Sequence, residues 1–216
     1  MSLREAAFVR AHTIVASPPM LPEVRLHLAT ELSPLWEKTQ DWLDDVGVPP
    51  PYWAFAWAGG QAVARYLLDA PDVAVGRAVL DFGAGSGMIA IAAARVRAKR
   101  VVANDVDAFA IAAIAMNAAL TDVAVAVVGD DLIGTPVDAQ LLLAGDVCYE
   151  QPMAGRVGAW LRERARAGVT VLLGDPGRSH LVPKEHLVEL ARYDVPTHAD
   201  VEGRDVRSAG VWRVRG

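Results

Sequence analysis

The sequence predicts an α/β fold, with a seven-stranded, mostly parallel sheet whose last strand is antiparallel and with helices on both faces. From residue 78 onward, short apolar runs alternate with Ala-rich stretches of helical length, as in successive βαβ units. Near the end of the chain, two strand-like runs follow each other without room for a crossover helix, so we expect them to pair antiparallel.

The individual elements follow in order along the chain. A stiff Pro-rich loop passes into a helix expected at residues 60–68. Apolar runs bounded by turn residues predict strands at 77–82, 100–106, 123–131, 139–147 and 168–176. Ala-rich or amphipathic runs predict helices at 88–97, 107–121, 153–167 and 184–192. The two closing strands are expected at 191–202 and 209–216.

Length and composition limit the possible functions. The 216 residues fit a single domain, in which we expect residues 1–58 to be an N-terminal extension forming part of the cleft and residues 59–216 to be the catalytic core. The chain has 21 Lys and Arg against 26 Asp and Glu, which argues against a nucleic-acid partner because phosphate binding needs a clustered basic face. No apolar run approaches the roughly 20 residues of a membrane span. With a single cysteine, Cys148, a reducing compartment is indicated, and we expect a cytoplasmic monomer.

The most specific run is LDFGAGSGM, residues 80–88. Its glycines, Gly83, Gly85 and Gly87, suit a tight turn where a ligand approaches bare backbone. A dinucleotide fingerprint is G-x-G-x-x-G, but Met88 occupies the place of its third glycine, which speaks against a nicotinamide-dependent oxidoreductase. The pattern G-x-G-x-G after an acid resembles motif I of the S-adenosylmethionine-dependent methyltransferases of the seven-strand class.

Acidic residues accompany this glycine loop. Asp81 ends the strand before it, and Asp105 lies about 20 residues downstream, where a carboxylate can accept hydrogen bonds from both ribose hydroxyls. In the class that the loop resembles, the position of Asp130 contacts the adenine amino group, although the Asp-Asp pair there could simply cap a turn. The resemblance implies S-adenosyl-L-methionine as cofactor, bound by Asp81, Gly83, Gly85, Ser86, Gly87, Asp105 and Asp130.

An aromatic run, PPPYWAFAWAGG, precedes the first core helix at residues 49–60. Aromatic residues usually pack in a core. The Gly pair at a helix start, with Trp57 beside it, would nevertheless suit a wall for the methionine end of the cofactor, because backbone amides there can meet a carboxylate. We therefore expect Trp57 and Gly59 to contact the cofactor.

The run GDVCYE, residues 145–150, ends the fourth strand at the carboxyl edge of the sheet. In an in-line displacement, an amine must aim a free lone pair at the methyl carbon. Asp146 could attract a lysine ammonium and then orient it or accept its proton, and Tyr149 could supply an aromatic face or a hydrogen bond. Asp146 and Tyr149 are the candidate catalytic residues, although an acid at a strand end and a buried Tyr could also be purely structural.

Five runs together, PYWAFAWAGGQAVARYLLD, VLDFGAGSG, NDVD, GDVCY and GDPGR, resemble the electron transfer flavoprotein β-subunit lysine methyltransferases, from about residue 22 to the C-terminus. The resemblance implies a Rossmann-like seven-stranded methyltransferase sheet with an N-terminal helical extension. It also implies that the protein partner is the flavoprotein β subunit and that the reaction is trimethylation of its lysines. The chain departs from the family at Ala58, where W-P-G-G is frequent, and at Asp130, where Asn is frequent.

Other functions remain open for the same cleft. The acceptor could be another protein, for example a ribosomal protein, or a small-molecule amine. A non-catalytic Rossmann-like binding or scaffold module could also retain the glycine loop. The five His residues form no close cluster, so no metal is expected.

Overall fold

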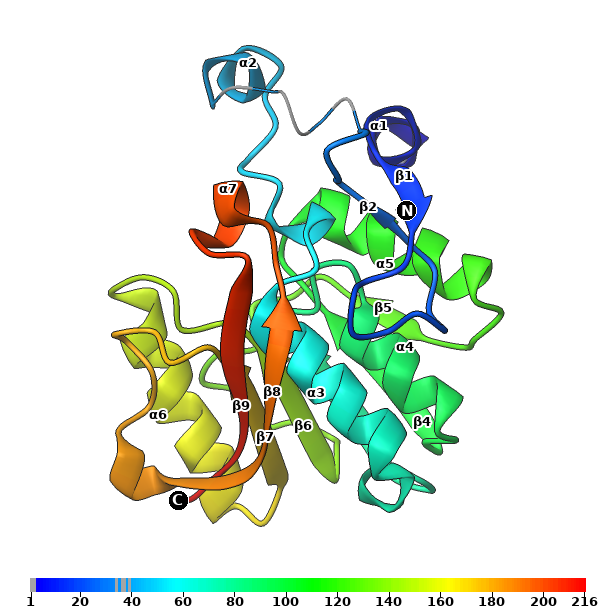
Figure 1. Cartoon of the computed structure of the whole chain (residues 1–216). Coiled ribbons are helices and arrows are strands. Elements are labelled where there is room, and N and C mark those ends of the chain that lie inside the picture. Colours follow the sequence, from blue (N-terminus) through cyan, green and yellow to red (C-terminus); the bar gives the residue numbers. More distant parts are fainter. Residues whose placement is uncertain (1–2, 34, 36–37, 39) are drawn as a thin grey trace.

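The computed structural model describes residues 3–33, 35, 38 and 40–216. Its main sheet has seven strands in the order β5-β4-β3-β6-β7-β9-β8 (Figure 1). Strands β3 to β7 pair in parallel, whereas β9 runs antiparallel to both β7 and β8, which confirms the predicted sheet. The strands are β3 (Ala78–Phe82), β4 (Arg100–Asn104), β5 (Ala126–Val128), β6 (Leu141–Gly145), β7 (Thr170–Asp175), β8 (Leu187–Pro196) and β9 (Val206–Val214).

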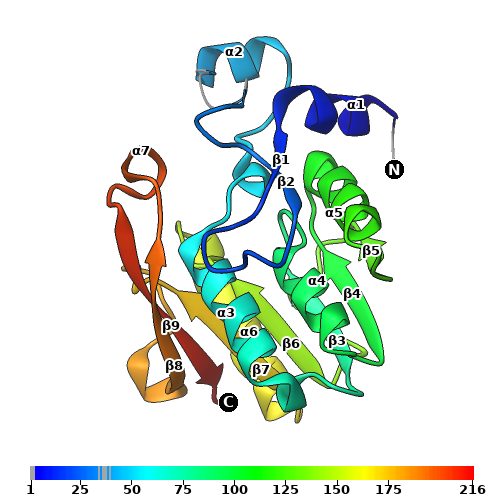
Figure 2. The same cartoon turned by 45° about the vertical axis from the view of Figure 1, so that its right-hand side comes forward.

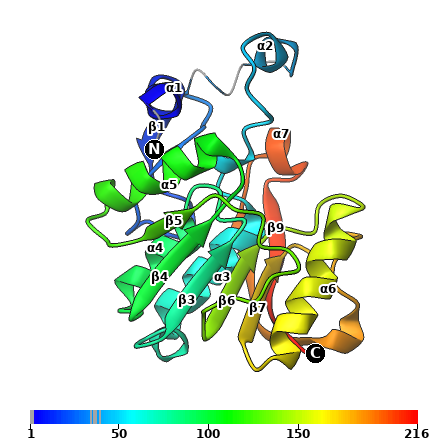
Figure 3. The same ribbon diagram turned by 180° about the vertical axis from the view of Figure 1, so that it is seen from behind.

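Helices pack on both faces of this sheet, as predicted. One face carries α3 (Ala58–Asp69) and α4 (Met88–Arg95). The other face carries α6 (Met153–Arg166), which packs against β7 and β9 and lies beside β7 in Figure 3. Because both faces are covered, the central strand β6 is continuously apolar, and all of Leu141–Gly145 except the final glycine is buried.

The N-terminal extension lies above the carboxyl edge of the sheet, as Figure 2 shows. It consists of α1 (Leu3–His12), β1 (Ile14–Ala16), β2 (Leu26–Leu28), α2 (Gln40–Asp45) and the short 3-10 helix η1 (Tyr52–Ala54). The extension packs its own small core, which includes Trp53, against α5 (Ala108–Leu120). The prediction of a helical extension was incomplete, because β1 and β2 pair as a two-stranded antiparallel sheet.

The C-terminal part differs from its prediction. The helix expected at 184–192 is wrong: a 3-10 turn, η3 (Lys184–His186), leads directly into β8, and the second half of the predicted strand 191–202 contains a short helix, α7 (Ala199–Glu202). The run LVELARY has good helix formers, but its backbone groups pair with β9 over most of the strand. Tertiary pairing thus overrides local propensity here.

The order of the strands determines where a ligand can bind. From β3 the chain moves outward to β4 and β5, and it then returns to place β6 on the other side of β3. In open α/β sheets, ligands bind outside the carboxyl ends of the strands at such a reversal. The glycine loop follows β3 and the run GDVCYE follows β6, so both motifs lie at this point. Among the described residues, no helix is long and apolar enough to cross a bilayer.

Candidate functional site

The glycine loop turns the chain from β3 into α4. Gly83, Gly85 and Gly87 have φ angles of 64°, 53° and 80°, in the left-handed region that glycine adopts without steric penalty. A Cβ on Gly83 would lie 2.9 Å from Cγ1 of Val147, so a side chain there would fill the turn. Among the predicted residues, those that line the pocket above the loop are Trp57, Gly83, Gly85, Ser86 and Asp146.

Asp105 stands at the end of β4 beside this loop. Its Oδ2 accepts a hydrogen bond from the amide of Gly85 (2.8 Å), and its Oδ1 accepts one from the amide of Asp107 (3.0 Å). Burial raises the pKa of Asp105, and these hydrogen bonds oppose the rise. A carboxylate has about four acceptor sites, so two remain for the hydroxyls of a ribose. The loop, whose glycines carry no side chains, and the free acceptor sites of Asp105 fit a nucleoside cofactor.

Asp130 lies after the neighbouring strand β5. Nδ2 of Asn104 donates to its carbonyl oxygen (2.9 Å), which ties it to the end of β4. The adjacent Asp131 caps the following turn, since its Oδ1 accepts from the amide of Ile133 (3.0 Å). The turn-capping alternative therefore applies to Asp131. The side chain of Asp130 is exposed and makes no hydrogen bond to any residue that the structure describes.

Asp81 lies beneath the loop and not in the pocket. Its side chain is fully buried, and its Oδ2 accepts a hydrogen bond from the amide of Ala90 in α4 (2.9 Å). This placement corrects the prediction of a cofactor contact, because the carboxyl group instead fastens α4 to β3 and supports the loop from below.

Burial raises the pKa of Asp81 to about 8. The unfolded carboxyl titrates near 3.9, so between about pH 4 and pH 8 the folded state binds the extra proton and stability falls as pH rises. Asp81→Asn keeps the shape and an acceptor without this titration. We expect the free energy of unfolding of the variant, relative to wild type, to be higher at pH 8 than at pH 5 by about 3 kcal/mol. Urea unfolding of both proteins at the two pH values measures this difference. An equal difference at both values would contradict the assignment.

The first turn of α3 packs directly on the ends of β6 and β7. A Cβ on Gly59 would lie 2.4 Å from the carbonyl oxygen of Gly174, and one on Gly145 would lie 2.7 Å from Cα of Gly60. The Gly pair therefore permits close backbone packing. Gly60 lines the pocket, whereas Gly59 packs against Gly174, so the cofactor contact of Gly59 stays a prediction.

Two acidic side chains cap the N-terminus of α3. The amide of Ala58 donates to Oε1 of Glu202 (2.9 Å), and the amide of Gly60 donates to Oδ2 of Asp146 (2.7 Å). The expectation that the amides of this helix start bind the cofactor carboxylate is therefore corrected for these two, because the protein's own carboxylates already accept from them.

Arg178 joins the acidic groups at this point. Its Nη1 donates to Oδ1 of Asp146, and its guanidinium lies 3.6 Å from Oδ2 of Asp175 and 3.6 Å from Oε2 of Glu202. All three carboxylates are buried, and burial raises the pKa values of Asp175 and Glu202. Asp146 also has a φ of 59°, a costly conformation for a residue other than glycine that is typical of functional sites. The cluster thus holds Asp146 in one position.

Tyr149 lies at the rim of the pocket. Its ring centroid is 5.4 Å from that of Tyr52, which lines the pocket. Burial raises the pKa of the Tyr149 hydroxyl, with a further contribution from Glu150. The phenol is therefore protonated at neutral pH and can donate a hydrogen bond.

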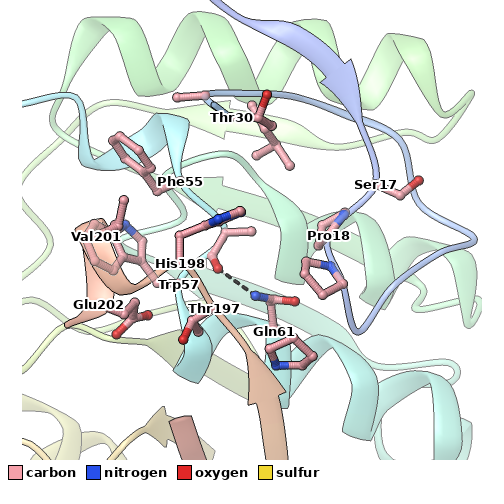
Figure 4. A pocket seen from close by; sticks show the side chains of 15 residues that line it. Ser17, Pro18, Thr30, Phe55, Trp57, Gln61, Thr197, His198, Val201 and Glu202 are labelled. Carbon is pink, nitrogen blue, oxygen red and sulfur yellow. Dashed lines mark hydrogen bonds between the residues drawn. The ribbon is translucent and has the colours of Figure 1, made fainter. Parts of the chain in front are cut away.

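A second cavity, of about 120 Å³, lies between the N-terminal extension and the segment around α7 (Figure 4). The N-terminal extension contributes Pro18 and Thr30 to its wall, and the segment around α7 contributes His198 and Glu202. The part of the extension before residue 52 thus lines this cavity and not the pocket above the glycine loop, so its contribution to the cofactor cleft stays a prediction. Phe55 and Trp57 line both cavities.

Sequence reasoning missed Arg178, Glu202 and Tyr52. Arg178 belongs to the run GDPGR, and a charged residue just after a strand that ends at this edge was a usable signal. Tyr52 belongs to the aromatic run but had no feature separating it from Trp53, which is buried in the core. Glu202 gave no signal, because it is brought here by the closing strand pair.

The comparisons with known proteins agree with this geometry. A family model described as "Ribosomal protein L11 methyltransferase (PrmA)" matches residues 65–140. The electron transfer flavoprotein beta subunit lysine methyltransferase of Danio rerio is 39% identical over 206 residues, which is 93% of this chain and 79% of that protein. The protein of the same name from Homo sapiens is 34% identical over 219 residues, 95% of this chain and 80% of that protein.

Solved structures share the fold at low sequence identity. Magnesium protoporphyrin IX methyltransferase from Synechocystis PCC 6803, with bound SAH, has a TM-score of 0.54 at 15% identity and covers 73% of this chain and 81% of its own. A ribosomal protein L11 methylase from Lactobacillus delbrueckii subsp. bulgaricus has a TM-score of 0.52 at 21% identity, covering 74% of this chain and 80% of its own. These structural matches establish the Rossmann-like methyltransferase fold. The family follows from the sequence identity to the curated relatives over nearly the whole chain. This chain belongs to the family of the electron transfer flavoprotein beta subunit lysine methyltransferases.

Proposed function

We propose that this protein transfers methyl groups from S-adenosyl-L-methionine to lysine side chains of the electron transfer flavoprotein beta subunit. The observation that carries the proposal is that similarity to the relatives of this name extends over 93% to 95% of the chain. It therefore includes the acceptor side, with Asp146 and Tyr149, as well as the glycine loop.

A ribosomal protein is the second candidate acceptor. The ribosomal protein L11 methyltransferase of Pelobacter propionicus is 30% identical over 192 residues, 83% of this chain and 57% of that protein. The family model for those enzymes ends at residue 140, before Asp146. The relatives named for the flavoprotein are more similar, at 34% to 39% identity over 79% to 85% of their own length, so the flavoprotein is the better-supported substrate.

The cofactor would be held by the glycine loop and by two flanking acids. Asp105 would accept hydrogen bonds from the ribose, Asp130 would contact the adenine, and Ser86 and Trp57 would line the pocket above the loop. S-adenosyl-L-methionine would supply an electrophilic methyl group on a sulfonium, and the attack of the amine on that methyl carbon would release S-adenosylhomocysteine.

Asp146 and Tyr149 would act on the acceptor amine. Asp146 already accepts hydrogen bonds from Gly60 and Arg178, one on each carboxylate oxygen. Each oxygen retains an acceptor site, so we propose that Asp146 orients the amine by accepting its N–H. The amine itself loses its extra proton to solvent, because desolvation and a nearby positive charge both lower the pKa of a lysine.

We also propose that the protein works as a cytoplasmic monomer with residues 1–58 and 59–216 forming one domain. Residues of the extension and of the core together line the second cavity, of about 120 Å³.

Labelled-methyl transfer to the purified flavoprotein beta subunit tests the proposal. We expect wild type to label it and Asp105→Ala to lose the transfer, because the variant removes the ribose acceptor. S-adenosylhomocysteine at about 100 times its Kd should raise the Tm of wild type by roughly 5 to 10 °C, and NADH should not. Asp72→Ala, on an exposed turn, is the matched control and should behave as wild type. Labelling of ribosomal protein but not of the flavoprotein would select the second candidate.

A further inference from the structure

Two exposed tyrosines meet at the mouth of the pocket. Tyr52 in η1 and Tyr149 after β6 expose 50% and 46% of their surface, and their ring planes are inclined by 49°. The two residues are far apart in the sequence, and neither ring is buried. Trp53, the neighbour of Tyr52 in the same short helix, is only 2% exposed. Within this short helix, Trp53 therefore packs in the core, whereas Tyr52 is exposed at the pocket.

The turn that carries Tyr52 also fixes a third ring. Nε1 of Trp57 donates to the carbonyl oxygen of Tyr52 (2.8 Å), and the two ring centroids are 6.1 Å apart with planes inclined by 58°. Tyr52 and Trp57 line the same pocket as Asp146. A cation that approaches Asp146 therefore meets aromatic rings beside a carboxylate.

A carboxylate and an aromatic ring recognise a methylated amine in different ways. A carboxylate recognises the N–H donors of an ammonium group, and each methyl added removes one donor. An aromatic face attracts the positive charge itself and is the usual means of recognising quaternary ammonium groups. The aromatic rings therefore suit the later methylation states of a lysine better than Asp146 does.

We propose that Tyr52, together with Tyr149, forms the binding wall for the acceptor amine and favours its cationic, methylated forms. The inference rests on the proposed function, because it takes the acceptor to be a lysine. Tyr52 is then a residue that determines which methylation states the site accepts.

Binding measurements test the wall without catalysis. The probes are Nε-trimethyl-lysine and its neutral isostere, in which carbon replaces the quaternary nitrogen, titrated in the presence of S-adenosylhomocysteine. We expect wild type and Tyr52→Phe to bind the cation about tenfold more tightly than the isostere, because both retain the ring face. Tyr52→Ala should reduce this preference at least about threefold, with the remainder due to Tyr149, Trp57 and the charge of Asp146. Tyr193→Ala, which removes a tyrosine from the edge strand β8, should keep it.

The methylation states formed on the flavoprotein beta subunit give a second readout. Mass spectrometry of products should find Tyr52→Ala accumulating the monomethyl and dimethyl states, with Tyr52→Phe restoring the wild-type distribution. Equal binding of the two probes by wild type, or an unchanged preference in Tyr52→Ala, would overturn the proposal. If wild type prefers the cation but methylates no protein, the proposed function fails while the aromatic wall stands.

Discussion

Replacing Asp146 with alanine is expected to lower kcat for methyl transfer by about 100-fold or more, because the amine then loses the group that orients its lone pair. The variant should also lose about 1 kcal/mol of unfolding free energy, since the amide of Gly60 loses its cap. S-adenosylhomocysteine should still bind within about tenfold of wild type, because Asp105 and the glycine loop are unchanged. Single-turnover kinetics, urea unfolding and calorimetry measure the three quantities.

Two further variants separate the roles of Asp146. Asp146→Asn retains one acceptor oxygen for Gly60 but places an amide where Arg178 needs a carboxylate, so it should restore most of the stability and leave kcat at least about tenfold low. Glu150→Ala removes an exposed acid four positions away and should change little. A wild-type kcat in Asp146→Ala would exclude Asp146 from catalysis.

Local sequence was sufficient for the parallel part of the fold. The parallel strands β3 to β7 are rich in apolar residues, and turn or cap residues follow them: Asp107, for example, caps α5 by accepting a hydrogen bond from the amide of Phe109. The closing strand β8 could not be predicted in the same way. Its residues include good helix formers, and its strand conformation depends on pairing with β9, which lies later in the chain.

The sequence predicted where the site lies in the fold, but not which side chains face the pocket and which are buried beneath it. Sequence spacing correctly brings the glycine loop, Asp105 and Asp146 to one edge, because carboxyl ends of parallel strands share that edge. It cannot tell whether a side chain faces the pocket or the layer beneath it, and Asp81 and Gly59 proved to lie beneath. The Arg178 and Glu202 contacts to Asp146 and Ala58 depend on loops whose paths are set by tertiary packing.

A methyl group added at Gly174 should destabilise the whole site. A Cβ there would lie 2.2 Å from the carbonyl oxygen of Gly59 and 2.6 Å from Cγ2 of Val63, and the first of these is backbone that can yield only if α3 moves. We expect Gly174→Ala to lose about 3 kcal/mol or more of unfolding free energy and roughly 10 °C in Tm. Because Gly60 would move with α3 away from Asp146, the folded fraction should also lose methyl transfer.

Gly155→Ala, on the exposed side of α6, is the matched control. Its new methyl group would meet only the flexible end of Gln151 at 3.2 Å, and the variant should gain up to about 1 kcal/mol of unfolding free energy from helix propensity. Thermal unfolding of the two variants decides the matter, since equal Tm values would mean that α3 is not pressed against β7 in solution.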